Sequence, residues 1–229
     1  RADASAEAAL SKVRELHLWE DPQWVRLGHW KARSFGRGYL SDAERTGFFL
    51  APSGPSDPRS EIEAMTLGLY DENPGPEPQH PRCRFPARSA WLTARLGLEA
   101  SVLPKADCSR FEDWRRLMDP GSVSLIFATA YLNNPASMFG HTFLRLERRG
   151  VSEGERLRDN TLNFSAETGD DGGVLFAVKG LAGLYAGKYA VQPYYMMVQQ
   201  YNNIESRDLW EYRLTLTVAE VQLLAAHAW

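Results

Sequence analysis

His141 is the residue of this sequence best placed to do chemistry. It opens the run HTFLRLE, directly after a turn that contains Asn133, Pro135 and Gly140. A histidine side chain exchanges protons near neutral pH, and a strand holds its ring in a fixed orientation, so His141 is a candidate general base. A hydrogen-bonded structural histidine is the competing interpretation, and the pattern alone does not choose between the two.

Asn163 is the candidate for the group that orients this imidazole. It lies in LNFSA, residues 162–166, a segment of alternating polarity that we expect to pair with the strand of His141. An asparagine side-chain oxygen accepts a ring N–H and thereby fixes the tautomer, as the third residue does in cysteine–histidine–asparagine sites. An ordinary asparagine at a sheet edge or turn is the alternative.

Five further residues are candidates for substrate binding, from the turn before His141, an aromatic run and the start of a late strand: Asn134, Ser137, Tyr194, Tyr201 and Glu205. The polar turn residues and neighbouring backbone N–H groups would stabilise an oxyanion. The two tyrosines lie among methionines in residues 192–202, a composition that suits an apolar ligand, although core packing is the default for such residues. Glu205 is an acid–base candidate.

The two cysteines, Cys83 and Cys108, each precede an expected helix. A thiol near a helix N-terminus has a stabilised thiolate, so either one could serve as a nucleophile with His141. The alternative is a disulfide, which would close a loop of about 24 residues, contribute on the order of 3 kcal/mol and suit an oxidising compartment. The even count favours the disulfide. His141, Glu205 and Asp208 lack metal-ligand spacing, so we predict no metal site and no cofactor.

These residues must be positioned by a sheet, and the pattern predicts an α+β fold. We expect an antiparallel sheet of about five strands flanked by helices. The expected strands are Ser122–Ala128, His141–Glu147, Thr161–Ser165, Tyr189–Val198 and Arg207–Leu216. Residues 47–50, GFFL, are expected to form a further short buried strand.

Most of the expected helices come from the N-terminal half. They are Ala4–Leu18, one starting at Asp21–Pro22, one starting at Asp57–Pro58, Pro86–Leu96, one starting at Ser109, and a last one opened by the capping box Thr217–Glu220. The proline-rich residues 71–81 predict a boundary between a helical scaffold, residues 1–80, and a histidine-bearing region, residues 81–229. The last helix reaches Trp229 without a stop signal, so we expect a fragment of a longer protein, cut before the end of the catalytic core.

Composition excludes some functions. The net charge of −3 gives no electrostatic reason to expect nucleic acid as a partner, and 44% hydrophobic with 24% charged residues is ordinary for a globular domain. The longest apolar tract, residues 174–185, is too short to span a bilayer. Composition gives no prediction of the oligomeric state.

Four motifs together resemble a known family: LNNPASMFGHTFLRL around His141, CRFPAR at residues 83–88, LNFSA at residues 162–166 and ESRDLWEY at residues 205–212. The chain resembles the Lnb N-terminal periplasmic domain family, from about residue 16 to its end. The resemblance implies a circularly permuted papain-like fold, related to NlpC/P60 and lecithin–retinol acyltransferase proteins. His141 matches the family's histidine. The family's nucleophilic cysteine, in an Asn-Cys-Ser element, would follow residue 229.

The resemblance also implies a function. It indicates a periplasmic lipoprotein N-acyltransferase that works through a cysteine thioester with His141 as general base, with phospholipid or lipoprotein as partner and with membrane proximity through segments outside this sequence. The 229 residues alone would then be inactive. A cysteine peptidase or amidase acting on cell-wall peptides, and a non-catalytic periplasmic binding or assembly module, are the alternatives.

Overall fold

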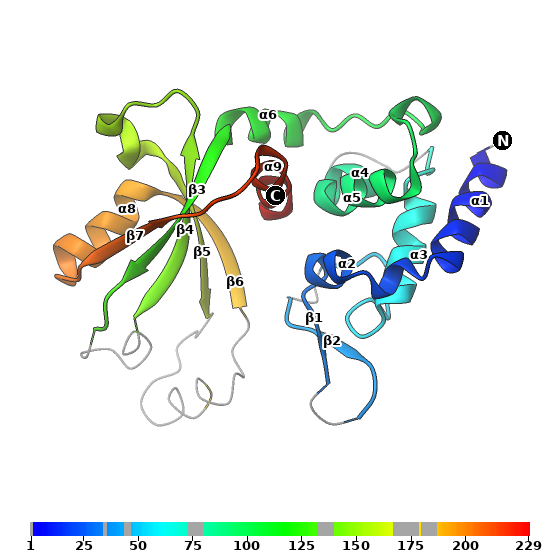
Figure 1. The fold of residues 1–229 in the computed structure, drawn as a ribbon, viewed down its shortest axis with the longest axis horizontal. Helices are drawn as coiled ribbons and strands as arrows, with labels where there is room; N and C mark the ends of the chain where they lie inside the picture. Colours follow the sequence, from blue (N-terminus) through cyan, green and yellow to red (C-terminus); the bar gives the residue numbers. More distant parts are fainter. Residues whose placement is uncertain are drawn as a thin grey trace. The chain divides into compact units, whose positions relative to one another are not determined.

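The structure is a computed structural model that describes residues 2–33, 36–43, 47–72, 80–131, 140–166, 179 and 187–229 (Figure 1). The chain forms two compact units. The first unit comprises residues 1–115 together with Trp229, and the second unit comprises residues 116–228. The sequence predicts a boundary at residues 80–81. Most of the proline-rich segment on which that prediction rests, residues 73–79, lies outside the described residues.

The first unit is mainly helical, with one small hairpin. Its elements are α1 (Ala2–Glu15), η1 (Leu18–Glu20), α2 (Pro22–Leu27), β1 (Trp30–Ala32), β2 (Tyr39–Ser41), α3 (Pro58–Gly68), α4 (Pro81–Arg84), α5 (Pro86–Leu96), η2 (Ala100–Val102) and the start of α6 (Ser109–Met118). The expected starts of α2 and α3 are confirmed, because Asp21 and Asp57 cap them through side-chain oxygens and a proline follows each. Gly97 ends α5 in the left-handed conformation.

A buried ion pair organises the centre of the first unit. Arg88 Nη1 donates to Glu61 Oε1 at 2.9 Å and to the Phe48 carbonyl at 2.9 Å. Glu61 also accepts the backbone N–H groups of Leu50 and Ala51. The prediction of a strand at residues 47–50 is therefore wrong. The backbone groups of this segment form hydrogen bonds with the buried pair of Arg88 and Glu61 instead of with a neighbouring strand.

Cys83 and Cys108 form a disulfide, with their Cα atoms 5.0 Å apart. Cys83 is fully buried at α4, and Cys108 directly precedes α6. The disulfide interpretation is confirmed, and it removes both thiols of this sequence from nucleophilic chemistry.

The second unit is built on a five-stranded antiparallel sheet, as the sequence predicts. Its strands are β3 (Pro120–Ala128), β4 (His141–Arg148), β5 (Asn160–Ala166), β6 (Gly187–Pro193) and β7 (Leu209–Arg213), in the order β6-β5-β4-β3-β7. The other elements are η4 (Glu153–Arg158), α8 (Tyr194–Val198), the π-helix η5 (Gln199–Ile204) and α9 (Val218–Ala228). Thr217 and Glu220 form the expected capping box of α9.

The two faces of the sheet carry different residues. Register places Ala128 opposite His141, Ile126 opposite Phe143 and Ser124 opposite Arg145, so these six side chains share one face. The helical turns of α8 and η5 pack on this face and bury Phe143 among apolar side chains. Helix α9 packs against β3 from the other side, where Val123 and Leu146 are fully buried (Figure 1).

The strand expected at Tyr189–Val198 ends early, and that part of the prediction is wrong. Strand β6 stops at Pro193, which has no backbone N–H for a further ladder bond. The chain then turns into α8 and η5, in which Tyr194, Met197 and Tyr201 are buried at helical spacing. The helical spacing outweighs the strand preference of the aromatic residues.

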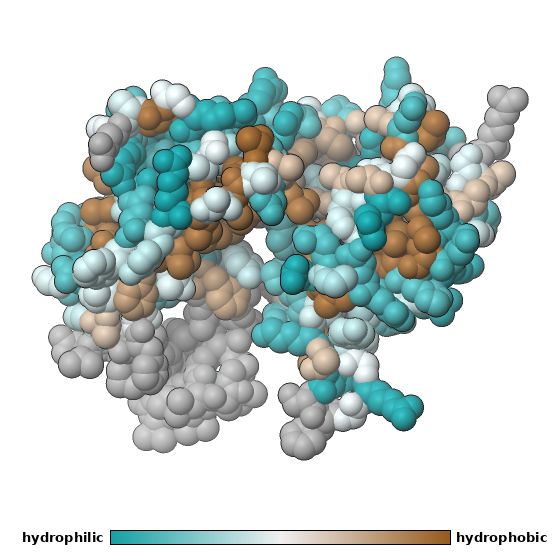
Figure 2. Space-filling model, in the orientation of Figure 1, coloured by the Kyte–Doolittle hydropathy of each residue, from teal (hydrophilic) through white to brown (hydrophobic). Residues whose placement is uncertain are grey.

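Apolar side chains also reach the surface. Hydrophobic patches of limited size appear between hydrophilic ones on the face drawn in Figure 2. The exposed large side chains of the second unit include Trp210 and Tyr212 on β7 and Phe164 on β5. Scattered exposed apolar residues are normal for a globular protein.

Candidate functional site

His141 and Asn163 form a hydrogen-bonded dyad at one end of the sheet. His141 Nε2 lies 2.6 Å from Asn163 Oδ1. Asn163 pairs with Phe143 across β4 and β5, so it stands diagonally opposite His141 on the same face of the sheet. The amide oxygen can only accept, so Nε2–H is the donor of this hydrogen bond, and in the neutral form of the imidazole the lone pair is on Nδ1. The hydrogen bond expected from the sequence is present.

Gly140 allows the chain to enter β4 at this point. Its φ is +88°, and a Cβ there would lie 2.6 Å from the Phe127 ring and 2.8 Å from the Ala128 carbonyl oxygen. The atoms that lie close to Gly140 therefore belong to strand β3 of the protein itself. It fixes the backbone immediately before the imidazole.

Two aromatic side chains lie beside the half-buried imidazole. Its ring centroid lies 5.7 Å from that of Tyr201 and 6.3 Å from that of Phe143, and these two rings stack on each other at 5.8 Å. Tyr201 belongs to the π-helix η5, a rare element that occurs frequently at functional sites. Burial raises the pKa of the Tyr201 hydroxyl, against the opposing charge of Arg207, so this hydroxyl is protonated at neutral pH.

Arg207 is a part of the site that the sequence reasoning missed. Its guanidinium is almost fully buried and lies 4.7 Å from the Tyr201 ring centroid. Nε donates to the Thr129 carbonyl at 2.6 Å and Nη2 to the Ala128 carbonyl at 3.1 Å, while Nη1 donates to Glu205 at 2.9 Å. Arg207 therefore holds the end of β3, next to His141, against the tyrosine. The sequence feature that could have pointed to Arg207 is its position within the motif ESRDLWEY.

The predicted binding residues have separate outcomes. Asn134 and Ser137 lie outside the described residues. Tyr201 is beside His141, and Glu205 is the ion-pair partner of Arg207. Tyr194 is buried over Arg145, 5.3 Å from its guanidinium carbon, with its ring 6.4 Å from Phe143. Tyr194 is thus part of the core that supports the site.

The described residues contain no group of three or more histidine, cysteine or acidic side chains arranged to hold a metal ion. The chemistry this arrangement can do is proton transfer. The lone pair on His141 Nδ1 can take a proton from a nucleophile, and Asn163 then stabilises the resulting imidazolium through Nε2–H.

Fold and site together define the class of protein: an α+β domain that presents a histidine–asparagine dyad at the end of an antiparallel sheet, joined to a disulfide-bonded helical unit. The chain belongs to the family described as the Lnb N-terminal periplasmic domain, whose sequence model matches residues 110–229. Residues 16–95 match a domain of unknown function (DUF7843). The family's description as a periplasmic domain supports an exported location.

No curated protein and no solved structure matched the chain. Among the helices that the structure describes, none combines the length and apolar character needed to cross a bilayer.

Proposed function

We propose that the second unit carries the histidine–asparagine part of a cysteine-dependent acyl-transfer centre in the periplasm. The observation that carries the proposal is the 2.6 Å hydrogen bond between His141 Nε2 and Asn163 Oδ1. It sets the tautomer that a general base needs, and it lies within the region matched by the Lnb periplasmic family. In this proposal the core is permuted papain-like, with the histidine before the nucleophile in the chain.

The thiol comes from outside these 229 residues, because both cysteines of the sequence are joined in a disulfide. His141 Nδ1 takes the thiol proton while the thiolate attacks the carbonyl carbon of an ester. The ester C–O bond breaks, the alcohol leaves with the proton from the imidazolium, and a thioester remains. An amine then attacks the thioester carbonyl carbon while His141 accepts the amine proton. The C–S bond breaks, the imidazolium returns that proton to the leaving thiolate, and the products are an amide and the free thiol.

The substrate class in this proposal is an acylated lipid or lipoprotein. It rests on family membership and on the periplasmic description of the family. The disulfide between Cys83 and Cys108 is compatible with that compartment, since disulfides persist in oxidising environments. Hydrolysis of a cell-wall peptide would use the same dyad, with water as the acceptor, and is an outcome of the test below.

Mass spectrometry tests the proposal on the parent protein extended beyond Trp229. The protein is incubated with a diacylated lipoprotein, and separately with a cell-wall peptide. We expect an acyl-sized thioester adduct on a cysteine outside the disulfide, with its formation slowed about 10²- to 10⁴-fold in His141→Ala, the range of a lost general base. Asn163→Ala should slow the adduct less, and Asn163→Gln should restore part of the rate.

His17→Ala is the matched control, because His17 is an exposed histidine of the first unit. It should form the adduct at the rate of the unchanged protein. An adduct that forms at the normal rate in a folded His141→Ala variant would refute the assignment of the base. An adduct formed only with the cell-wall peptide would assign the peptidase alternative, and no adduct with either substrate would favour a binding or assembly module.

A further inference from the structure

Arg207 forms hydrogen bonds with the backbone directly beside the dyad of His141 and Asn163. Its Nη2 donates to the carbonyl of Ala128, and its Nε donates to the carbonyl of Thr129. Ala128 is the residue of β3 that stands opposite His141 in the register of β3 and β4. Two of the hydrogen bonds of this guanidinium therefore fix the backbone of the strand next to the imidazole.

The backbone before Arg207 adopts a conformation that is unfavourable for its residue type. Ser206 has a φ of +53°, in the left-handed region that favours glycine. After this turn the Arg207 N–H donates to the Tyr201 carbonyl at 2.9 Å, and the Thr129 N–H donates to the Asp208 carbonyl at 3.0 Å. A strained turn persists only where the surrounding contacts enforce it, and such turns occur often at functional sites. The strain at Ser206 is thus a second observation that points to Arg207.

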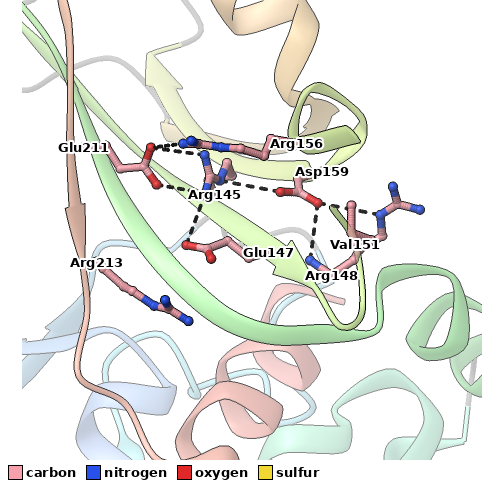
Figure 3. A pocket seen from close by; sticks show the side chains of 8 residues that line it. All are labelled: Arg145, Glu147, Arg148, Val151, Arg156, Asp159, Glu211 and Arg213. Carbon is pink, nitrogen blue, oxygen red and sulfur yellow. Dashed lines mark hydrogen bonds and ion pairs between the residues drawn. The ribbon is translucent and has the colours of Figure 1, made fainter. Parts of the chain in front are cut away.

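Arg145 is the natural comparison, because it is as buried as Arg207 and lies on the same face of the sheet as His141. Arg145 lines a polar cavity of about 570 Å³ in the second unit (Figure 3). Its guanidinium forms ion pairs with three carboxylates: Glu211 at 2.8 Å, Glu147 at 3.3 Å and Asp159 at 3.6 Å. Arg145 therefore binds side chains, whereas Arg207 directs two of its nitrogens to backbone carbonyls.

We propose that Arg207 is a positioning residue for His141. It acts through two contacts, the end of β3 at Ala128 and the ring of Tyr201, whose centroid lies 4.7 Å from the guanidinium carbon and 5.7 Å from the imidazole centroid. An imidazole that is free to tilt loses the 2.6 Å hydrogen bond to Asn163, and this hydrogen bond sets the tautomer. The inference rests on the proposed function for the role of His141 as base, but its effect on the imidazole can be measured without acyl transfer.

Nitrogen-15 NMR of the histidine side chains in the 229-residue protein tests the proposal. The measurement is made at about pH 8, where an ordinary imidazole is neutral. In the unchanged protein we expect the proton of His141 on Nε2, in slow exchange with water. In Arg207→Ala this proton should exchange at least about tenfold faster and should be shared between both nitrogens, because the hydrogen bond to Asn163 opens more often.

Free guanidinium provides a rescue that a general loss of stability would not show. At millimolar concentration, far below the denaturing range, it should occupy the space left in Arg207→Ala, donate to the same carbonyls and slow the exchange again. Sodium chloride at the same ionic strength should have no such effect. Arg207→Lys is the second variant, for the case that Arg207→Ala does not fold. It keeps a cation beside Glu205, but an ammonium group lacks the planar fork, so exchange should still be faster than in the unchanged protein.

Arg145→Ala is the matched control, because it removes an equally buried arginine about 13 Å along β4 from His141. Its Nε2 proton should exchange as in the unchanged protein, and backbone amide spectra show which variants are folded. The proposal is overturned if folded Arg207 variants keep this proton as well protected as the unchanged protein does. It is also overturned if Arg145→Ala loses the protection equally.

The parent protein provides the functional measurement. In Arg207→Ala the limiting rate of adduct formation should fall about 10- to 100-fold, while the lipoprotein concentration that gives half of this rate stays unchanged, because a misplaced base slows the chemical step and leaves binding intact. A fall in rate without a change in the imidazole signals would overturn the positioning role. If the unchanged parent protein forms no adduct, but the Arg207 variants lose the Nε2 proton, the positioning role holds and the proposed function fails.

Discussion

The carboxylate of Glu147 is a single group whose ionisation makes the stability of the sheet depend on pH. It accepts hydrogen bonds from the Ser122 and Ser124 hydroxyls and lies 3.3 Å from Arg145. Burial alone would raise the pKa of Glu147, but the two serine hydroxyls and the charges of Arg145 and Arg213 outweigh burial and hold this pKa below its ordinary value of 4.5.

A lowered folded-state pKa stabilises the fold above the unfolded-state pKa, and that stability is lost as pH falls through the folded-state value. We therefore expect the difference in free energy of unfolding between the unchanged protein and Glu147→Gln to be largest near neutral pH and to shrink below about pH 4.5. Urea unfolding at a series of pH values measures it. A difference that stays constant with pH, or one matched by the exposed control Glu155→Gln, would contradict the expectation.

Residue chemistry was predictable where it depended on local pattern. The alternation of LNFSA and HTFLRLE put Asn163 and His141 on one face of neighbouring strands, and the hydrogen bond follows from that. Arg207 was not predictable in this way. Its role depends on the carbonyl groups of Ala128 and Thr129, nearly eighty residues away in sequence, and no local spacing encodes such a contact.

Among the elements of the first unit, α3 and α5 are joined by the buried pair of Glu61 and Arg88. Burial lowers the pKa of Arg88 to about 10, and burial raises the pKa of Glu61 despite the opposing hydrogen bonds and the charge of Arg88. Arg88 also lies over the rings of Phe48 and Phe85, at 4.3 Å and 4.6 Å from their centroids.

Arg88→Met should destabilise the protein by about 3 kcal/mol at neutral pH, because it leaves the Glu61 carboxylate buried without its cation. The loss of Arg88 would raise the pKa of Glu61 further. A raised folded-state pKa gives stability below the unfolded-state pKa that is lost as pH rises through the folded-state value, so the destabilisation should be smaller at acidic pH.

Chemical denaturation at two pH values measures this effect. Arg95→Met is the matched control, because Arg95 pairs with Asp21 at 2.9 Å on the surface and should cost no more than about 1 kcal/mol. An Arg88→Met variant as stable as this control would refute the role of the buried pair.

Elements with clear caps or strict alternation were predictable. Helices α2, α3 and α9 begin at their predicted caps, and β3, β4 and β5 lie within two residues of their predicted bounds. Residues 47–50 and 194–198 were assigned incorrectly for a common reason. Their aromatic and apolar content favours strands, but a distant partner decides the backbone: Glu61 and Arg88 for the first segment, and the packed face of the sheet for the second.

At the scale of the whole molecule, the chain consists of two units that are stabilised by different interactions. The first unit has a helical core, the buried ion pair and the disulfide, and the second unit has the sheet with the dyad and the arginine-lined cavity. The α+β class and the family were accessible from the sequence, because alternation and motif spelling are local properties. The cavity was not, since its lining comes from three segments, residues 145–151, 156–159 and 211–213.

The unfolding of each unit can be followed by a separate measurement, so the contribution of the disulfide to stability can be tested in the intact chain. Six of the seven tryptophans belong to the first unit, and Trp210 is the one in the second. Reduction of the Cys83–Cys108 bond, or the double change Cys83→Ser with Cys108→Ser, opens a loop with a sequence separation of 25 and should cost the first unit about 3 kcal/mol. Tryptophan fluorescence should then show unfolding at lower denaturant, while amide hydrogen exchange in β3 and β4 keeps its protection. Equal loss of protection in both units would show that they unfold as one cooperative body, and an unchanged fluorescence transition would show that the disulfide contributes little to stability.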